Sequence, residues 1–175
     1  KVYLAFNKPR GIVCTAEKRE KNNVIDYLSY PVRIYPVGRL DKDSEGLLLM
    51  TNDGAIVNGI MRARNRHEKE YQVEVNKETT PEFLKKMASG VPILDTVTRP
   101  CRIQKTGERS FTIILTQGLN RQIRRMCEAL GYRVTKLKRV RIMNIHLKDL
   151  KTGEYRPLTE KELAELKKQI GEEKR

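Results

Sequence analysis

The 175-residue chain has no tryptophan, only three cysteines and only two histidines. Cys14, Cys101 and Cys127 are odd in number and far apart, and neither they nor the histidines have the spacing of a zinc site. The cysteines therefore predict unpaired thiols in a reducing cytoplasm. The sequence also lacks a signal peptide and any apolar run of membrane-spanning length, so a cytoplasmic protein that does not cross a membrane is expected.

Several common catalytic signatures are missing as well. The chain has no glycine-rich phosphate loop, no Ser or Cys nucleophile paired with a His, and no carboxylate cluster for two metals. Nothing indicates a nucleotide cofactor, so any catalysis must use Asp, Tyr and Arg side chains.

Acidic residues are outnumbered, with 22 Asp and Glu against 36 Lys and Arg, which gives a net charge of +14. This excess predicts a polyanionic partner, nucleic acid before membrane, although a protein with a merely basic surface has the same composition. With 38% hydrophobic residues, the chain is long enough to bury a core, as one domain or as two tightly joined halves that share a cleft.

The hydrophobic pattern predicts more strands than helices. Strands are expected over 2–6, 12–15, 47–51, 70–75, 97–103, 111–116 and 136–147, and helices over 24–28, 56–62, 79–89, 121–130 and from 159 onward. Thr79 with Glu82 and Thr159 with Glu162 have capping-box spacing, and Asn120 is expected to cap the 121–130 helix. Strands joined mostly by hairpins favour an α+β fold with a largely antiparallel sheet.

The first candidate for chemistry is Asp41, which lies between Arg39 and Lys42 just before the buried 47–51 strand. A carboxylate in this position is held on a rigid scaffold and stays reachable, and the cations stabilise its negative charge. A solvated turn with three incidental charges would have the same spacing. Asp43 is an alternative reactive acid.

The second candidate is Tyr71, which shares one face of its strand with Val73 and Val75. Its hydroxyl is therefore carried inward, either as part of the core or beneath a stacking platform for a base.

The third candidate is a basic helix face. Arg121, Arg124 and Arg125 lie near the start of the 121–130 helix, which suits an anion such as phosphate or carboxylate. Arg124 lies in the middle of this face and is expected to point into a cleft. Arg139 and Arg141 are expected to share one strand face and to extend the basic surface, although surface arginines are common.

Three ordered segments and the opening turn carry a family resemblance. They read G-R-L-D-K-D-S-E-G-L-L at 38–48, K-E-Y at 69–71, G-L-N-R-Q-I-R-R-M at 118–126 and N-K-P-R-G at 7–11. The pattern resembles the catalytic domain of bacterial rRNA pseudouridine synthases of the RsuA family, in the group of RluB, RluE and RluF. Residues 21–28 and 67–71 look most like the RluF branch, which acts on 23S rRNA.

The resemblance implies a pseudouridine synthase fold: a two-part mixed sheet, mostly antiparallel, with flanking helices and a central RNA-binding cleft. Residues 1–160 would form the catalytic domain, in two halves that share the cleft, and residues 161–175 a C-terminal helix and tail. Family members usually carry a small S4-like RNA-binding domain before the catalytic domain, and this domain is expected to be absent here. A monomer is expected.

The resemblance also assigns roles to residues. Asp41 would be the nucleophile of uridine isomerisation, Tyr71 would stack on the target base and remove its C5 proton, and Arg124 would pair with Asp41. Arg39 would enter the gap left by the flipped uridine. The other RNA contacts are expected from Lys42, Arg121, Arg125, Arg139 and Arg141.

The family uses no metal or cofactor, and the expected partner is a stem-loop of 23S rRNA. Three alternatives stay open: the same chemistry on another structured RNA such as 16S rRNA or tRNA, a non-catalytic RNA-binding or ribosome-assembly module, and, less favoured, a metal-dependent nuclease.

Overall fold

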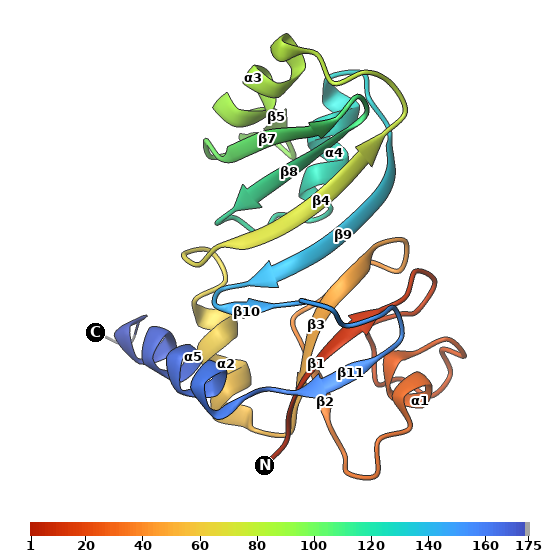
Figure 1. Ribbon diagram of the computed structural model, residues 1–175, viewed down its shortest axis with the longest axis vertical. Helices are drawn as coiled ribbons and strands as arrows, with labels where there is room; N and C mark the ends of the chain where they lie inside the picture. The colour runs from red at the N-terminus through yellow and green to blue at the C-terminus, as the bar shows by residue number, and fades with distance from the viewer. Residues whose placement is uncertain (174–175) are drawn as a thin grey trace.

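A nine-stranded mixed sheet runs through the computed structural model, which describes residues 1–173 (Figure 1). The last two residues of the expected tail, 174 and 175, lie outside the described residues. The strands are β1 Tyr3–Lys8, β2 Tyr35–Val37, β3 Glu45–Thr51, β4 Lys69–Val75, β5 Pro92–Ile93, β6 Thr96–Val97, β7 Arg102–Gly107, β8 Ser110–Leu115, β9 Val134–Ile142, β10 Ile145–His146 and β11 Tyr155–Pro157. The helices are α1 Val24–Leu28, α2 Gly54–Arg62, α3 Pro81–Ser89, α4 Gln122–Ala129 and α5 Glu160–Glu173.

The sheet consists of two halves joined at one short seam. Its main strand order is β11-β1-β3-β9-β4-β8-β7, with β2 paired to β3 and β10 paired to β9. The β3–β9 pair is parallel and has two residue pairs, whereas the other neighbours in this sheet are antiparallel. The expected α+β fold with a mixed, mostly antiparallel sheet is therefore confirmed.

Gly46 makes the seam possible. It pairs with Arg139 across the two halves and has a φ of +110°, a conformation that residues with a side chain rarely adopt. A Cβ at this position would overlap the carbonyl oxygen of Arg139. The two backbones can approach this closely because residue 46 has no side chain.

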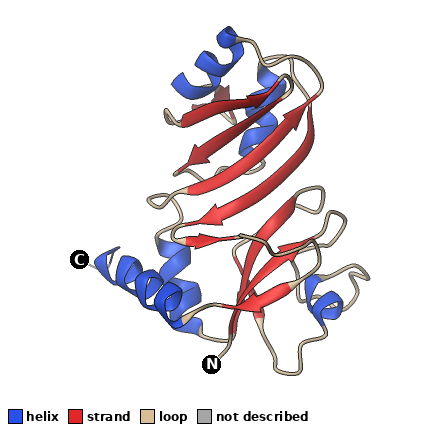
Figure 2. Ribbon diagram, in the orientation of Figure 1, coloured by secondary structure: helices blue, strands red, loops and turns tan. Residues whose placement is uncertain are grey.

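Each half has its own core, and the helices cover the sheet as Figure 2 shows. In one half, α3 and α4 pack on β4, β8 and β9 through residues that include Phe83, Met87, Phe111 and Met126. In the other half, β3 is buried on both of its faces. Leu47 and Leu49 pack with α2 and α5, while Leu48 and Met50 pack with β1 and α1.

Helix α5 starts as its sequence predicts. Thr159 Oγ1 accepts a hydrogen bond from Glu162 N at 3.1 Å, and Glu162 Oε1 accepts one from Thr159 N at 2.8 Å, so the capping box is confirmed. Leu166 and Ile170 of the same helix are buried in the core, as its periodicity predicts.

Several local predictions were wrong. The single strand expected over 97–103 is replaced by the end of β6 and the start of β7, with residues 98–101 outside both. The strand expected over 12–15 is reduced to one isolated bridge, Val13 with Asn23. Thr80, not Thr79, caps α3 by accepting a hydrogen bond from Phe83 N at 3.1 Å. Buried Thr79 is instead within hydrogen-bonding distance of carbonyls of the β7–β8 turn. Spacing did not separate the two adjacent threonines because only one of them has its hydroxyl aimed at the helix end.

A further error concerns α4, which begins at Gln122 with Arg121 at the N-cap. Arg121 adopts the left-handed conformation, with φ 47°. The side chain of Asn120 does not cap the helix, because its oxygen accepts a hydrogen bond from Arg125 at 2.8 Å.

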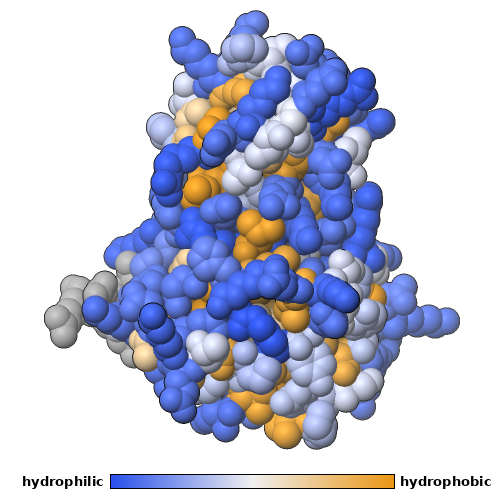
Figure 3. Space-filling view, viewed as in Figure 1, coloured by the Kyte–Doolittle hydropathy of each residue, from blue (hydrophilic) through white to orange (hydrophobic). Residues whose placement is uncertain are grey.

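Hydrophilic side chains dominate the face of the molecule in Figure 3, in keeping with a mean hydropathy of −0.62. Within the described part of the chain, every helix is too short or too polar to cross a membrane.

Candidate active site

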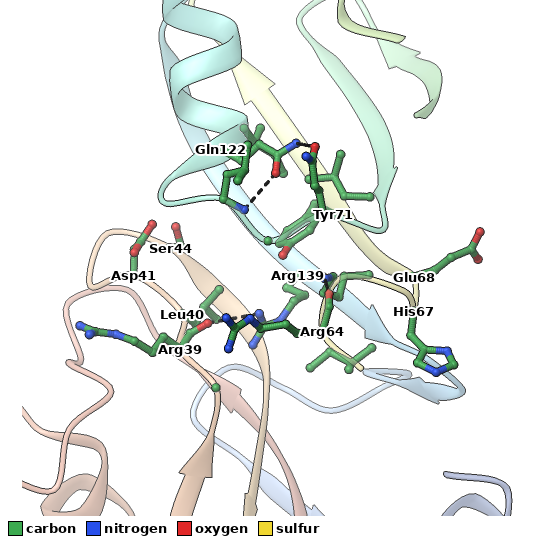
Figure 4. Close-up of a pocket in the computed structure, with 18 of the residues that line it drawn as sticks. Arg39, Leu40, Asp41, Ser44, Arg64, His67, Glu68, Tyr71, Gln122 and Arg139 are labelled. Atoms are coloured by element: carbon green, nitrogen blue, oxygen red, sulfur yellow. Dashed lines mark hydrogen bonds between the residues drawn. The ribbon is translucent and has the colours of Figure 1, made fainter. Parts of the chain in front are cut away.

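A cavity of about 490 Å³ lies between the two halves of the sheet, beside the β3–β9 seam (Figure 4). One half contributes residues 37–41, Ser44 and part of α2. The other half contributes Tyr71, residues 117–123, Leu137 and Arg139. The expected central cleft is therefore present, and it contains both Asp41 and Tyr71.

Asp41 belongs to the loop that leads into β3, and 37% of its side chain is exposed. Its carbonyl accepts a hydrogen bond from Ser44 N at 3.0 Å, which closes a turn. The preceding Leu40 is buried, and its carbonyl accepts a hydrogen bond from Cys14 Sγ at 3.2 Å. The carboxylate is thus reachable from the cavity while its backbone is fixed.

The turn after β1 contacts the Asp41 loop and helps to fix its position. Gly11 N donates to Lys42 O at 2.7 Å. Lys8 is completely buried and donates to the carbonyls of Pro9 and Ile12 at 2.9 and 2.8 Å. Burial lowers the pKa of Lys8, and nearby acidic groups oppose this shift. The N-K-P-R-G segment therefore stabilises the conformation of the Asp41 loop.

Arg121 links the two acidic residues of the loop. It donates two hydrogen bonds to the Asp43 carboxylate, at 3.0 and 2.8 Å, and its Nη1 lies 3.4 Å from Asp41 Oδ2. The hydrogen bond from Arg121 lowers the pKa of Asp43, and the same bond raises the pKa of Arg121. The cation nearest to Asp41 is therefore at the N-cap of α4.

The expected pairing of Arg124 with Asp41 was wrong. Arg124 is buried, at 8% exposure, and its Nη2 donates to Asp43 O at 2.9 Å and to Ser44 Oγ at 3.1 Å. Its Nε lies 3.6 Å from Asp43 Oδ2. Because Arg124 sits within the first turn of α4, it reaches the base of the loop, while Arg121 at the helix end reaches the carboxylates. Burial lowers the pKa of Arg124.

Tyr71 faces Asp41 across the cavity. It lies on β4 opposite Ile113 of β8 and Arg139 of β9, and it packs against the core of that half. Figure 4 shows the ring at the cavity wall with its hydroxyl pointing into the space. The predicted inward orientation is confirmed.

Arg139 and Arg141 do not share a strand face, contrary to expectation. Tyr71 pairs with Arg139, but Glu70 pairs with Arg141, so Val140 is an extra residue in β9. This β-bulge reverses the alternation of side chains beyond it. Arg139 therefore lines the cavity, while Arg141 forms ion pairs with Glu68 and Glu70, at 3.1 and 3.2 Å, on the other face.

Arg139 is buried rather than part of an open basic surface. It donates to Leu47 O at 2.9 Å and to Arg39 O at 3.3 Å, and both carbonyls belong to the opposite half of the sheet. Its guanidinium therefore ties the two halves together beneath the cavity.

The other expected RNA contacts differ in their accessibility. Arg39 and Lys42 are exposed beside Asp41. Arg125 is half-buried and donates to Asn120 O at 3.0 Å as well as to the Asn120 side chain.

Two cavity residues lie in the motif segments but were given no role from the sequence. Gln122 is buried, and its side-chain oxygen accepts a hydrogen bond from Leu119 N at 3.2 Å, which shapes the loop before α4. Lys69 lines the cavity two residues before Tyr71. The two-residue period of a strand, which places positions 69 and 71 on one face, would have found it.

Comparison with known proteins gives the family. A profile described as RNA pseudouridylate synthase matches residues 2–129. The ribosomal large subunit pseudouridine synthase B of Bacillus subtilis (strain 168) is 36% identical over 174 residues, which cover 95% of this chain and 71% of that protein. The chain belongs to the RNA pseudouridine synthase family.

Other pseudouridine synthases are more similar in sequence. The dual-specificity RNA pseudouridine synthases RluF of Salmonella typhi and Escherichia coli (strain K12) are 55% and 54% identical over 169 residues, which cover 97% of this chain. The chain spans 58% of the length of these two relatives. A crystal structure described as a pseudouridylate synthase superimposes with a TM-score of 0.86 at 30% identity, over 94% of this chain and 73% of that one.

The three residues expected to be catalytic, Asp41, Tyr71 and Arg124, lie inside the segment that matches the family profile. Among residues 1–173, no three His, Cys, Asp or Glu side chains are grouped so that they could hold a metal ion.

Proposed function

We propose that this domain isomerises a specific uridine of a structured RNA to pseudouridine, with Asp41 as the nucleophile. The observation that carries the proposal is the position of Asp41 across one cavity from the Tyr71 ring, in a chain of this family. The net charge of +14 suits an RNA substrate.

The reaction rearranges bonds within one nucleotide. The N1–C1′ bond breaks, the base turns, and a C5–C1′ bond forms; C5 loses its proton and N1 gains one, so nothing is oxidised or reduced. The Asp41 carboxylate assists by attacking the sugar or the base or by removing a sugar proton. Tyr71 stacks on the base and its hydroxyl removes the C5 proton, for which its orientation into the cavity is suitable (Figure 4).

Two arginines have different roles at the catalytic loop. Arg121, 3.4 Å from Asp41, balances the negative charge. Arg124 fixes the backbone of the loop through Asp43 O and Ser44 Oγ. A nucleophile needs to be held within a fraction of an ångström of its productive position, and a buried guanidinium with two acceptors provides such a restraint.

The target nucleotide must leave its stack to reach Asp41, at a cost of roughly a few kcal/mol. Phosphate contacts with Arg39 and Lys42, both exposed beside the cavity, offset part of this cost. Arg39 also fills the gap that the flipped uridine leaves, because it combines exposure with a position next to Leu40 and Asp41.

The proposed substrate is a stem-loop of 23S rRNA. Support comes from the higher identity to the RluF proteins, 54–55%, than to the large subunit synthase B of Bacillus subtilis, 36%, and the small subunit synthase A of Yersinia pestis, 35%. The RluF relatives are named dual-specificity enzymes, so a second acceptor RNA, such as a tRNA, belongs in the assay. We propose that the catalytic unit is residues 1–160, acting as a cytoplasmic monomer.

The test is replacement of the nucleophile. Asp41→Asn should release no tritium from RNA labelled at uridine C5, while RNA binding stays within about threefold of wild type. Asp43→Asn is the matched control, because it removes the second acid of the same loop and should keep measurable turnover. Turnover by Asp41→Asn would refute the assignment. If wild type forms no pseudouridine in 23S rRNA, 16S rRNA or tRNA, the non-catalytic RNA-binding alternative holds.

Mapping pseudouridines in rRNA from a strain that lacks the protein identifies the uridine. A position that loses pseudouridine in 23S rRNA, and regains it with wild type but not with Asp41→Asn, is the expected result. Loss of pseudouridine in 16S rRNA or tRNA alone would show that this RNA, and not 23S rRNA, is the substrate.

A further inference from the structure

The charged residues of the cavity are divided between two ends. At one end, the two carboxylates of the Asp41 loop are held by Arg121. Elsewhere on the wall are three cations, Arg64, Lys69 and Arg139. Within residues 1–173, none of these three forms an ion pair with a carboxylate. This part of the cavity therefore has uncompensated positive charge.

The acidic residue nearest in sequence does not neutralise them. Glu68 lies among the cavity residues, but its carboxylate accepts hydrogen bonds from Arg102 and from Arg141 at 3.1 Å. Figure 4 shows the Glu68 side chain pointing away from the space that Tyr71 faces. The β9 bulge that moves Arg141 to the outer face thus also draws Glu68 away from Lys69.

Lys69 is built into this position. Its Nζ donates to the carbonyls of Arg64 and Thr116, which join the α2–β4 turn to the loop after β8. An ammonium group has three hydrogens, and these two carbonyls use two of them. Burial, together with the positive charges of Arg139, Arg99 and Arg64, lowers the pKa of Lys69 to about 8. Lys69 is half-buried, and a cation that is partly removed from water among other cations is destabilised unless an anion joins it.

The two arginines can also reach an anion. Arg64 is exposed, and within the described part of the chain its guanidinium makes no hydrogen bond. Arg139 uses Nε and Nη1 for main-chain carbonyls, and its Nη2 has no acceptor among residues 1–173. Figure 4 shows both side chains on the side of the cavity below the Tyr71 hydroxyl.

We infer that Arg64, Lys69 and Arg139 form a phosphate subsite, which binds one backbone phosphodiester of the RNA next to the flipped nucleotide. The inference rests on the proposed function for the identity of the ligand. A phosphodiester is singly charged, has two free oxygens for these donors, and lies one bond away from the sugar whose C1′ must reach Asp41. Such a contact fixes the ribose and leaves the base free to turn.

The test is a set of binding measurements with a 23S rRNA stem-loop, on the Asp41→Asn background so that the RNA is not converted. Lys69→Met should weaken binding about tenfold and reduce the slope of log Kd against log salt by about one phosphate contact. Lys69→Arg, which keeps the charge, should recover most of the slope. Lys168→Met, at an exposed lysine of α5, should change neither quantity.

A scan of neutral linkages identifies the phosphate. The stem-loop is made with one methylphosphonate at a time, and one linkage beside the target uridine should cost the parent protein about tenfold but cost Lys69→Met almost nothing. Arg64→Gln, at an exposed side chain, should show the same coupling if Lys69→Met fails to fold. Equal penalties in the parent and in both variants at every linkage would overturn the subsite.

The outcome for the subsite and the outcome for the proposed reaction are separable. Pseudouridine formation by wild type without coupling at any linkage would reject the subsite alone. Coupling at one linkage, with no pseudouridine formed by wild type, would reject the reaction and keep the subsite. Absence of RNA binding by the parent would reject the subsite.

Discussion

The guanidinium of Arg124 lies 2.9 Å from the main-chain oxygen of Asp43, not against the carboxylate of Asp41. A side chain that holds a backbone carbonyl determines where the loop is, whereas one that holds a carboxylate determines its charge. Substitution of a residue that positions the loop should therefore have different effects from substitution of one that balances its charge.

Replacement of Arg124 should therefore affect turnover more than binding. Arg124→Ala leaves Asp43 O and Ser44 Oγ without their donor, and turnover should fall at least about 100-fold while the Kd for RNA rises less than about fivefold. Arg124→Lys should not restore activity, because one ammonium cannot reproduce the planar guanidinium. Tritium release and anisotropy titration measure the two effects.

Arg125→Ala is the matched control for this prediction, because it removes an arginine of the same helix whose side chain, among residues 1–173, bonds only to Asn120. Equal losses of turnover and of binding in Arg124→Ala would contradict the positioning role.

Arg139 should contribute to stability as well as to the cavity. Arg139→Ala leaves the carbonyls of Leu47 and Arg39 without a donor at the join between the halves, which should cost about 1–3 kcal/mol. Urea unfolding measures the loss. Arg39→Ala, at an exposed side chain beside the same cavity, should unfold like wild type. A stable Arg139→Ala that only binds RNA more weakly would restore the interpretation of Arg139 as a surface contact.

Gly46→Ala tests whether the β3–β9 seam requires a residue without a side chain. The new Cβ would overlap Arg139 O and require an unfavourable φ, so the free energy of unfolding should fall by at least about 1–3 kcal/mol. Gly54→Ala is the control, because a Cβ there meets no atom within 4 Å. If the thermal midpoints of the two variants agree, the backbones do not need to approach this closely.

Glu162 gives a pH-dependent prediction. Its hydrogen bond with Arg156 and the capping box lower its pKa to about 2. A carboxyl group with a depressed pKa in the folded state stabilises the protein above its unfolded pKa, and this contribution is lost as the pH falls toward 2. Glu162→Gln should therefore melt below wild type at pH 7, and the difference should shrink between about pH 4.5 and 2.

The comparison for this prediction is Glu165→Gln, at an exposed position of the same helix. A melting difference for Glu162→Gln that is the same at pH 7 and pH 2.5 would show that the ionised carboxylate has no part in capping α5.

Much of the fold could be predicted because its determinants are local. The apolar run of β3 predicted a strand buried on both faces, and the alternation of β4 predicted that Tyr71 points inward. The Thr159–Glu162 spacing predicted the start of α5. Each of these needs only neighbouring residues, since strand period and capping geometry extend over a few positions.

The errors in the candidate site concern relations between distant segments. The two-residue period places Arg139 and Arg141 on one face, and only the pairing with β4 shows that Val140 is an extra residue. The partners of Arg124 lie 80 residues away or more in the sequence. Its distance from Asp41 depends on how α4 is oriented against the loop, and no local pattern contains that information.

The extra residue in β9 also sets the charge beside Lys69. With an uninterrupted register, Arg141 would stand opposite Lys69 and add another cation to that wall; instead Ile142 takes this place and lines the cavity. The bulge thus exchanges which side chains of β9 face the cavity, without any change in the sequence of the strand. One unpaired valine therefore keeps an additional positive charge away from Lys69 and places the apolar side chain of Ile142 beside the cations.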